Sequence, residues 1–269
     1  MLKNRLIPCV VLKGDLVVQS FGFKNYLPIG KIDAVIEFFV NWDVDEIVVI
    51  DIDATKERRT IDLRIVDRVA QKCNVPLTVG GGIANIEFIL EILKVGADKI
   101  CVNTVCFENP EFITLVSQRY GAQFITVAID AKLVDGKHMA FVRNGQVSTG
   151  YTVRDFARRA ESLGAGEIFL NSVDRDGSKR GYDIELLKTV SSSVRIPVIA
   201  CGGVGTSRDL PLAITAGGCS AASAANIFNH TELSTVAGKS IMKRAGIPIR
   251  IDSEVSYERY EFDFLGRPI

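Results

Sequence analysis

Short apolar runs recur along the chain, and each one ends in a polar or glycine-containing cluster. Continuous apolar runs of this kind are typical of strands buried on both faces of a parallel sheet. We expect eight such strands, at Leu6–Leu12, Glu46–Asp51, Pro76–Val79, Lys99–Asn103, Phe124–Asp130, Glu167–Asn171, Pro197–Cys201 and Ser220–Ala225. Amphipathic helical patterns lie between them, among them Arg64–Lys72, Ile86–Val95, Pro110–Tyr120, Val153–Leu163 and Ile184–Ser191. This alternation predicts an α/β fold with a parallel sheet.

The two halves of the chain repeat each other at one constant offset of 121 residues. The repeated positions are Glu46-Ile47 and Glu167-Ile168, Asp53 and Asp174, Asp62 and Asp183, Pro76 and Pro197, Gly81-Gly82 and Gly202-Gly203, and Gly96 and Gly217. A solenoid unit runs only ~20–50 residues, so each copy is half of a fold. Two similar halves of four strands predict a single (β/α)8 TIM barrel, for which about 250 residues are typical. We assign the barrel to residues 1–250 of the 269.

Two segments depart from this alternation. Residues 137–150 hold two β-prone runs on either side of Asn144-Gly145, a dipeptide typical of two-residue hairpin turns, so we expect a hairpin after the fifth strand. Beyond Arg250, the aromatic residues Tyr260, Phe262 and Phe264 alternate with acidic ones, which predicts a half-buried strand. We expect this C-terminal tail, residues 251–269, to pack on the barrel or on a partner.

Composition narrows the class of protein. The 32 basic and 32 acidic residues give no electrostatic reason to expect nucleic acid or a membrane as a partner. The first apolar stretch is interrupted by Pro8 and ends at Lys13, too short for a signal peptide or a spanning helix, so we expect a cytoplasmic protein. The six cysteines lack the spacing of a zinc site, and we expect buried reduced thiols, no metal and no cofactor. His138 and His230 are isolated, and we expect surface or structural roles for both.

Candidate chemistry gathers where strands end, because (β/α)8 enzymes have their active sites at the carboxyl ends of the strands. Glycines follow the third and seventh strands, at Gly80–Gly82 and Gly202-Gly203, and small polar residues follow the next strand in each half, at Asn103-Thr104 and Ala225-Asn226. Glycine turns let backbone N–H groups approach an anion closely, although a tight strand-to-helix turn needs glycine as well. The duplication favours two phosphate sites and a small bisphosphate ligand.

Three aspartates also stand at strand ends. Asp130 closes an apolar strand, where desolvation raises the pKa of a carboxyl group toward a value useful in acid–base catalysis; a helix cap or a loop salt bridge is the alternative. Asp176 fits either an orienting contact to ligand hydroxyls or a turn cap, and Asp51 is a further candidate for orienting the substrate.

Four charged residues stand at the opposite ends of the strands. Arg5, Glu46, Lys99 and Glu167 each begin an expected strand, and their charges sum to zero. A solvated ionic rim and a functional ring are both compatible with this pattern.

A set of ordered motifs identifies a resemblance to one family. The motifs are Arg5-Leu6-Ile7-Pro8-Cys9, Leu77-Thr78-Val79-Gly80-Gly81-Gly82-Ile83, Gly96-Ala97-Asp98-Lys99, Ala128-Ile129-Asp130-Ala131, Gly164-Ala165-Gly166-Glu167-Ile168, Asp174-Arg175-Asp176-Gly177, Ile196-Pro197-Val198-Ile199-Ala200 and Gly246-Ile247-Pro248-Ile249-Arg250. Together, from residue 1 to about residue 250, they resemble the cyclase subunit of imidazole glycerol phosphate synthase (HisF). That family is a (β/α)8 barrel that binds a two-phosphate ribonucleotide at the strand tops and receives ammonia from a glutaminase docked beneath.

The resemblance implies roles for individual residues. Asp130 matches the catalytic carboxylate on the fifth strand. The implied phosphate sites are Gly81, Gly82, Asn103 and Thr104 in the first half, and Gly177, Gly202, Gly203 and Asn226 in the second. The strand-bottom residues Arg5, Glu46, Lys99 and Glu167 match the charged ring through which ammonia enters, and Asp45 and Asp98 match positions at the glutaminase docking face.

Three departures from the family pattern put its chemistry in doubt. The family has a second catalytic aspartate on the first strand, and Val11 stands there in this chain. A family lysine falls on Gln19, and a serine of the second phosphate site falls on Asn226. Ring closure needs a proton donor and an acceptor on opposite sides of the substrate, and Val11 has no titratable group.

The same replacement is characteristic of HisF-like paralogues that supply ammonia in bacterial surface-sugar pathways, beside a glutaminase and a sugar amidotransferase that makes acetamidino groups. We therefore expect the ammonia-accepting subunit of such a heterodimer. The alternatives are a genuine cyclase and lyase of histidine biosynthesis, with Asp51 or Asp176 as the replacement acid, and a phosphate-binding scaffold without catalysis. A related sugar-phosphate isomerase is disfavoured, because it also needs an acid where Val11 stands.

Overall fold

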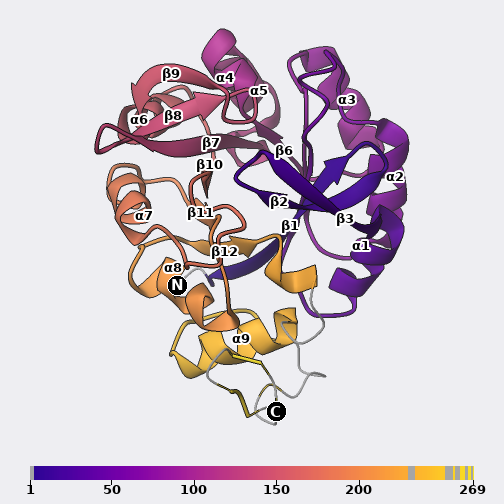
Figure 1. The fold of residues 1–269 in the computed structure, drawn as a ribbon. Coiled ribbons are helices and arrows are strands. Elements are labelled where there is room, and N and C mark those ends of the chain that lie inside the picture. Colours follow the sequence, from indigo (N-terminus) through magenta and orange to yellow (C-terminus); the bar gives the residue numbers. More distant parts are fainter. Residues whose placement is uncertain (1–2, 230–233, 252–256, 258–260, 264–265, 268) are drawn as a thin grey trace.

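The structure is a computed structural model that describes residues 3–229, 234–251, 257, 261–263, 266–267 and 269. Within these residues, eight parallel strands close into a barrel with helices around it (Figure 1). The barrel strands are β1 (Arg5–Lys13), β4 (Ile47–Asp51), β5 (Leu77–Gly80), β6 (Lys99–Val102), β7 (Ile125–Val134), β10 (Glu167–Ser172), β11 (Val198–Cys201) and β12 (Ala221–Ala224). The pairings of β7 with β10 and of β12 with β1 join the two halves. The predicted TIM barrel is confirmed.

Helices connect the strands and cover the outside of the barrel. They are α1 (Ile32–Val40), α2 (Leu63–Lys72), α3 (Ile86–Lys94), α4 (Thr104–Glu108), α5 (Glu111–Tyr120), α6 (Val153–Ser162), α7 (Ile184–Ser191), α8 (Leu210–Thr215) and α9 (Thr235–Arg244), with short 3-10 turns η1 (Ala122–Phe124), η2 (Ser207–Asp209) and η3 (Ile227–Asn229). The predicted strands and helices match these bounds to within one residue at each end, except that β7 continues to Val134.

Two of the repeated aspartates begin equivalent helices. Oδ1 of Asp62 accepts a hydrogen bond from the N–H of Arg64 at 2.9 Å, and Oδ1 of Asp183 accepts one from the N–H of Leu186 at 3.1 Å. An aspartate at this position satisfies a backbone donor that the first helical turn leaves unpaired. The repeat at these positions therefore reflects helix capping.

A hairpin follows the first barrel strand of each half. The strands β8 (Lys137–Val142) and β9 (Val147–Thr152) confirm the hairpin predicted at residues 137–150, but its connection has four residues, 143–146, instead of two. The strands β2 (Leu16–Phe21) and β3 (Asn25–Lys31) form a second hairpin that was not predicted. Because β2 and β8 turn back at the carboxyl ends of β1 and β7, both hairpins lie at the end of the barrel where active sites occur.

The C-terminal tail begins beside the amino ends of β1 and β4. Ile249 pairs with Asn4, just before β1. Tyr257 is 3% exposed; its hydroxyl donates a hydrogen bond to Asp43, and its carbonyl accepts one from Ser240 of α9. Figure 1 shows the chain end beside α9. Tyr260 and Phe264, on which the predicted tail strand depended, lie outside the described residues, and so does His230.

Candidate active site

A cavity of about 590 Å³ opens at the carboxyl ends of the barrel strands. Its charged lining residues are Asp51, Arg58, Arg59, Glu108, Asp130 and Asp176. Apolar side chains of the barrel interior, such as Val11, Ile50 and Phe169, also reach its lining. The cavity therefore has apolar side chains at its bottom and charged side chains at its rim.

Asp130 lies on β7 at the rim of the barrel interior. Its register partner on β10 is Asn171, and both residues line the cavity. Burial raises the pKa of Asp130 from its ordinary value to about 7, while the charge of Lys132 and a hydrogen bond from the backbone of Gly145 oppose the shift. A carboxyl group with this pKa can donate or accept a proton near neutral pH.

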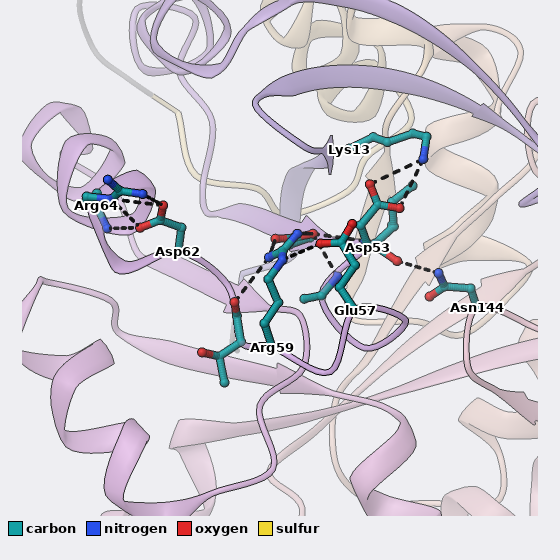
Figure 2. A network of polar contacts seen from close by, with 11 residues as sticks. Lys13, Asp53, Glu57, Arg59, Asp62, Arg64 and Asn144 are labelled. Atoms are coloured by element: carbon teal, nitrogen blue, oxygen red, sulfur yellow. Dashed lines mark hydrogen bonds and ion pairs between the residues drawn. The ribbon is translucent and has the colours of Figure 1, made fainter.

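Val11 lines the same cavity from β1, so β1 contributes no acid there. Asp51, at the end of the neighbouring strand β4, does not replace it. Arg59 Nη1 lies 2.5 Å from Oδ2 of Asp51, and the N–H groups of Asp53 and Ala54 donate to Oδ1 at 3.1 Å each. Figure 2 shows this network, in which Arg59 also bonds Glu57. Asp51 therefore fixes the loop between β4 and α2 and has little freedom to act on a ligand.

Asp176 is the other aspartate at the rim. Burial raises its pKa, although hydrogen bonds from Ser20, Phe23 and Gly22 oppose the shift. The Ser20 hydroxyl donates to Oδ2 of Asp176 at 2.6 Å. Asp176 thus contacts the β2–β3 hairpin while also lining the cavity.

The four residues of the predicted first phosphate site come together on the cavity lining. Gly81 and Gly82 form the turn after β5 with φ angles of 128° and 62°, and a Cβ on Gly82 would lie 1.8 Å from the carbonyl oxygen of Arg59. Only glycine fits such a backbone at this distance. Asn103 and Thr104 follow β6, where the Asn103 amide donates to the carbonyl of Ala128 at 3.0 Å and the Thr104 hydroxyl accepts from the N–H of Arg143 at 3.2 Å.

The predicted second phosphate site is not part of the cavity. Gly177, Gly202, Gly203 and Asn226 follow strands β10, β11 and β12, yet none of them is on the lining. A Cβ on Gly177 would lie 2.6 Å from the carbonyl oxygen of Ser20, so the β2–β3 hairpin packs directly on that glycine. The two phosphate sites therefore stay a prediction; they differ here in that the β2–β3 hairpin packs on Gly177 of the second one.

At the amino ends of the strands, four charged side chains form a closed ring. Nη1 of Arg5 lies 2.8 Å from Glu46 and Nη2 bonds Glu167, while Nζ of Lys99 lies 2.9 Å from Glu46 and 3.4 Å from Glu167. Each carboxylate thus contacts both cations. Burial by itself lowers the pKa of Arg5, but the hydrogen bonds and charges of Glu167 and Glu46 raise that pKa overall. We call this set the floor ring; its mutual pairing distinguishes it from four separately solvated charges.

A cluster of buried apolar side chains and thiols lies in the barrel interior between the floor ring and the cavity. It consists of Ile7, Cys9, Val48, Cys101, Phe169, Ile199, Cys201 and Ala221. All six cysteines are free. A hydrogen bond with Cys201, together with burial, raises the pKa of Cys9 well above its ordinary value, and burial raises that of Cys101 as well. The thiols of Cys9 and Cys101 therefore remain neutral, and an interior of this kind admits a small uncharged molecule far more readily than an ion.

The two positions predicted at a docking face differ in exposure. Asp98 is exposed, and its carboxylate accepts a hydrogen bond from the N–H of Leu77 at 2.8 Å. Asp45 is buried: Lys239 lies 2.8 Å from Oδ1, and the N–H of Leu6 donates to Oδ2 at 2.8 Å. In this structure Asp45 supports the strand ends from within and is not part of the surface.

Several residues of the site carried no recognised signal in the sequence. Arg58 and Arg59 lie in the loop after the repeated Asp53. The charge pattern of that loop does not identify them as site residues. Asn144, identified only as a turn residue, donates from its side chain to the carbonyl of Ile52 at 2.6 Å and so joins the β8–β9 hairpin to the loop after β4 (Figure 2). His138, expected to be structural, pairs with Asp183 at 3.2 Å, and that hydrogen bond raises its pKa.

The described residues contain no group of three or more potential metal ligands. Among the same residues, no helix has the length and apolar character needed to cross a membrane.

The fold and the site define a class: a (β/α)8 barrel of two similar halves, with a perturbed carboxyl group on its fifth strand and a paired ring of charges at its floor. A family model described as "Histidine biosynthesis protein" matches residues 5–234. The chain belongs to this family, and within it to the HisF group, as its relatives show.

Relatives align over most or all of the chain. A "Putative imidazole glycerol phosphate synthase subunit hisF2" from Vibrio vulnificus (strain YJ016) is 55% identical over 269 residues, covering 100% of this chain and 98% of that protein. The "Imidazole glycerol phosphate synthase subunit HisF" of Hyphomonas neptunium is 41% identical over 250 residues, covering 93% of this chain and 99% of that protein. The protein of the same name from Thermotoga sp. (strain RQ2) is 39% identical over 252 residues, covering 94% and 99%.

Proposed function

We propose that this chain is the ammonia-accepting half of a glutamine amidotransferase. It receives ammonia from a glutaminase subunit in a heterodimer and supplies it for acetamidino-sugar formation by a sugar amidotransferase. One observation carries the proposal: the closed floor ring of Arg5, Glu46, Lys99 and Glu167 lies beneath an apolar interior, while the first strand presents Val11 in place of an acid.

The floor supports a gated entry. Because each carboxylate bonds both cations, separating one cation from its two partners opens the ring and leaves the other cation to neutralise the carboxylates in part. Ammonia that passes the ring meets apolar side chains and neutral thiols. It therefore remains the uncharged nucleophile, since ammonium would have to be desolvated there at a large cost.

The strand tops support a limited chemistry. Asp130 can move a proton near neutral pH, but ring closure also needs a second proton-transferring group across the substrate. Val11 offers none. The proposal therefore assigns to this chain glutaminase docking, ammonia passage and the binding of a small phosphorylated ligand, without cyclisation.

The test mixes the protein with its cognate glutaminase and measures glutamine hydrolysis, complex formation and ammonia-dependent turnover of the family's ribonucleotide substrate. We expect a complex, stimulated hydrolysis and no turnover of the ribonucleotide. Val11→Asp restores an acid on the first strand, and any turnover that it creates should be absent from Val11→Asn, in which the new side chain has the same size but no titratable group. Absence of both a complex and stimulation would refute the proposal.

The runner-up is a genuine cyclase and lyase of histidine biosynthesis. The pKa of Asp130 favours it, and so does Asp176, which lines the cavity with a raised pKa. Asp51 is disfavoured as the replacement acid because Arg59 and two backbone N–H groups hold it. Ribonucleotide turnover by the unaltered protein, lost in Asp176→Asn and unchanged in Val11→Asp, would select this alternative.

A further inference from the structure

The β2–β3 hairpin is joined to the ends of β10 and β12 through the side chains of Asn226 and Asp176. Oδ1 of Asn226 accepts from the N–H of Ser20 at 3.2 Å, and its Nδ2 donates to the carbonyl of the same residue at 2.7 Å. The asparagine amide thus satisfies both backbone groups of one hairpin residue, as a neighbouring strand would. Gln19 adds a hydrogen bond to the carbonyl of Asn226 at 3.3 Å.

Asp176 holds the turn of the same hairpin. Its Oδ2 accepts from the Ser20 hydroxyl at 2.6 Å and from the N–H of Phe23 at 3.3 Å, and its carbonyl accepts from the N–H of Gly22 at 3.1 Å. The turn itself is tight, and in it Gly22 and Phe23 both have positive φ and Lys24 donates back to the carbonyl of Phe21 at 3.2 Å. We call the contacts of Asn226 and Asp176 with residues 19–23 the hairpin latch.

The hairpin latch depends on the residue type at position 226. A serine, which the family resemblance places there, has one hydroxyl on a short stem and cannot span from the N–H to the carbonyl of Ser20. An asparagine has a donor and an acceptor at opposite corners of a planar amide and can do so. The same change removes a hydroxyl from the implied second phosphate site and adds a bond that holds protein over it.

The latched hairpin packs on Gly177 of the second glycine cluster. A Cβ on Gly177 would meet the carbonyl oxygen of Ser20 at 2.6 Å and the ring of Phe21 at 2.5 Å. On its other side, a Cβ on Gly203 would meet the carbonyl oxygen of Gly181 at 2.3 Å. In the first half, Gly81 and Gly82 are also close to protein, yet both remain on the cavity lining.

The charges along the cavity differ between its two sides. Among the described lining residues, the cations are Arg58 and Arg59, and both belong to the loop that packs on Gly82. Arg58 is exposed and has no ion-pair partner among the described residues, whereas Arg59 is paired with Asp51. Glu108, on α4 after Thr104, also lines the cavity but is paired with Arg143 at 2.5 Å. The opposite side presents the carboxylate of Asp176, which has hydrogen bonds to the hairpin but no ion pair among the described residues, and which repels an anion. One end of the cavity therefore attracts a phosphate and the other does not.

From this asymmetry we propose that the strand-top cavity takes a small ligand with a single phosphate, seated at Gly81, Gly82 and Arg58, and that the hairpin latch has replaced the second phosphate site. This inference depends on the proposed function in one respect only, which is the binding of a phosphate at Gly82. It also gives a reason, separate from Val11, why a two-phosphate ribonucleotide is not the ligand of this chain.

The experiment titrates the isotope-labelled protein with inorganic phosphate and follows backbone amide resonances. In the unaltered chain we expect the Gly81 and Gly82 resonances to shift and saturate, and those of Gly177 and Gly203 to move less than a tenth as much. Asn226→Ser should add a saturable shift at Gly203. Equal shifts at Gly82 and Gly203 in the unaltered chain would overturn the inference.

A second measurement examines the hairpin latch without any ligand. Asn226→Ser should speed hydrogen exchange of the Ser20 and Gly22 amides at least tenfold. The control is Asn229→Ser, in which the lost side-chain bond, to the carbonyl of Ala225 at 3.1 Å, does not involve the hairpin. Unchanged exchange in Asn226→Ser would refute the latch. If phosphate shifts the amide resonances of neither glycine pair, the proposed phosphate ligand is wrong. The glutaminase assay still tests ammonia transfer independently of that result.

Discussion

The ammonium group of Lys239 lies 2.8 Å from Oδ1 of Asp45, and no part of the lysine is exposed to solvent. Asp43 lies 3.1 Å from the same ammonium group. Because Asp45 also binds the N–H of Leu6, this buried pair ties α9 to the starts of β1 and β4. Leu6 and Asp45 directly adjoin Arg5 and Glu46 of the floor ring, so the support of the floor extends to α9.

Replacing Lys239 with methionine removes the nearer cation of two buried carboxylates and leaves them only the half-exposed Arg250, 3.8 Å from Asp43 and 3.7 Å from Asp45. Removal of one partner from a buried ion pair costs about 3–5 kcal/mol, and we expect a loss of that order in the free energy of unfolding, measured with urea. Lys72→Met is the control, since Lys72 forms an exposed pair with Glu37 at 3.4 Å, and such pairs contribute about 0–1 kcal/mol. Adding Asp45→Asn to Lys239→Met should recover part of the loss; no recovery would show that the charge of Asp45 is not the cause.

Opening the floor ring should lower the stability of the protein and also let ammonia escape from it. Arg5→Ala leaves Lys99 alone to neutralise Glu46 and Glu167, so the carboxylates repel each other and the floor opens. We expect a loss of about 1–3 kcal/mol in unfolding free energy, below that of a fully buried pair because the Arg5 side chain is 24% exposed. In the complex with glutaminase, while the sugar amidotransferase consumes ammonia with its acceptor present, more ammonium should appear in solution for each glutamate formed. Lys13→Ala, which removes an exposed bridge to Asp53, should leave that ratio unchanged.

The barrel could be predicted because its signals are local. Each buried strand is an apolar run, and each repeated capping aspartate lies beside the helix that it begins, as Asp62 and Asp183 do. The β2–β3 hairpin was not predicted, because the apolar residues on either side of Gly22 were not interpreted as paired strands. Gly22 itself was a possible turn signal. The short turn of Asp135 and Gly136, which lets β7 run on into β8, was missed in the same way.

The site could be predicted only in part, because its decisive contacts join distant parts of the chain. The hairpin latch joins Ser20 to Asn226, and the burial of Asp45 depends on Lys239; neither pair is close in sequence. The internal repeat favoured two equivalent phosphate sites. The contacts differ between the halves, because Asn226 bonds Ser20 of the β2–β3 hairpin whereas Asn103 bonds the carbonyl of Ala128 on β7.

The C-terminal tail should contribute to stability through Tyr257. Tyr257→Phe removes the hydroxyl that donates to buried Asp43, although Lys239 remains 3.1 Å from the same carboxylate. A hydrogen bond contributes about 0.5–1.5 kcal/mol to stability, so we expect a loss of that size in urea unfolding. Truncation after Arg250 should cost at least as much. Tyr26→Phe, which loses only a part-buried bond to the carbonyl of Phe23, is the matched control. If truncation changes neither stability nor glutaminase binding, the tail has no structural role.

The pKa of Asp130 predicts how stability depends on pH. The value of about 7 in the folded chain exceeds the ~3.9 of an unfolded aspartate, so between these values the folded chain holds a proton that the unfolded chain has released. Stability from this residue therefore falls as the pH rises from about 4 to 7 and then levels off.

Asp130→Asn has no such proton. Relative to it, the unaltered protein should lose on the order of 3 kcal/mol of unfolding free energy between pH 5 and pH 8. Urea unfolding at several pH values measures this difference, with Asp135→Asn in the exposed β7–β8 turn as the control. Parallel curves for the unaltered protein and Asp130→Asn would mean that Asp130 is ionised throughout, and its role as a neutral-pH acid or base would then be untenable.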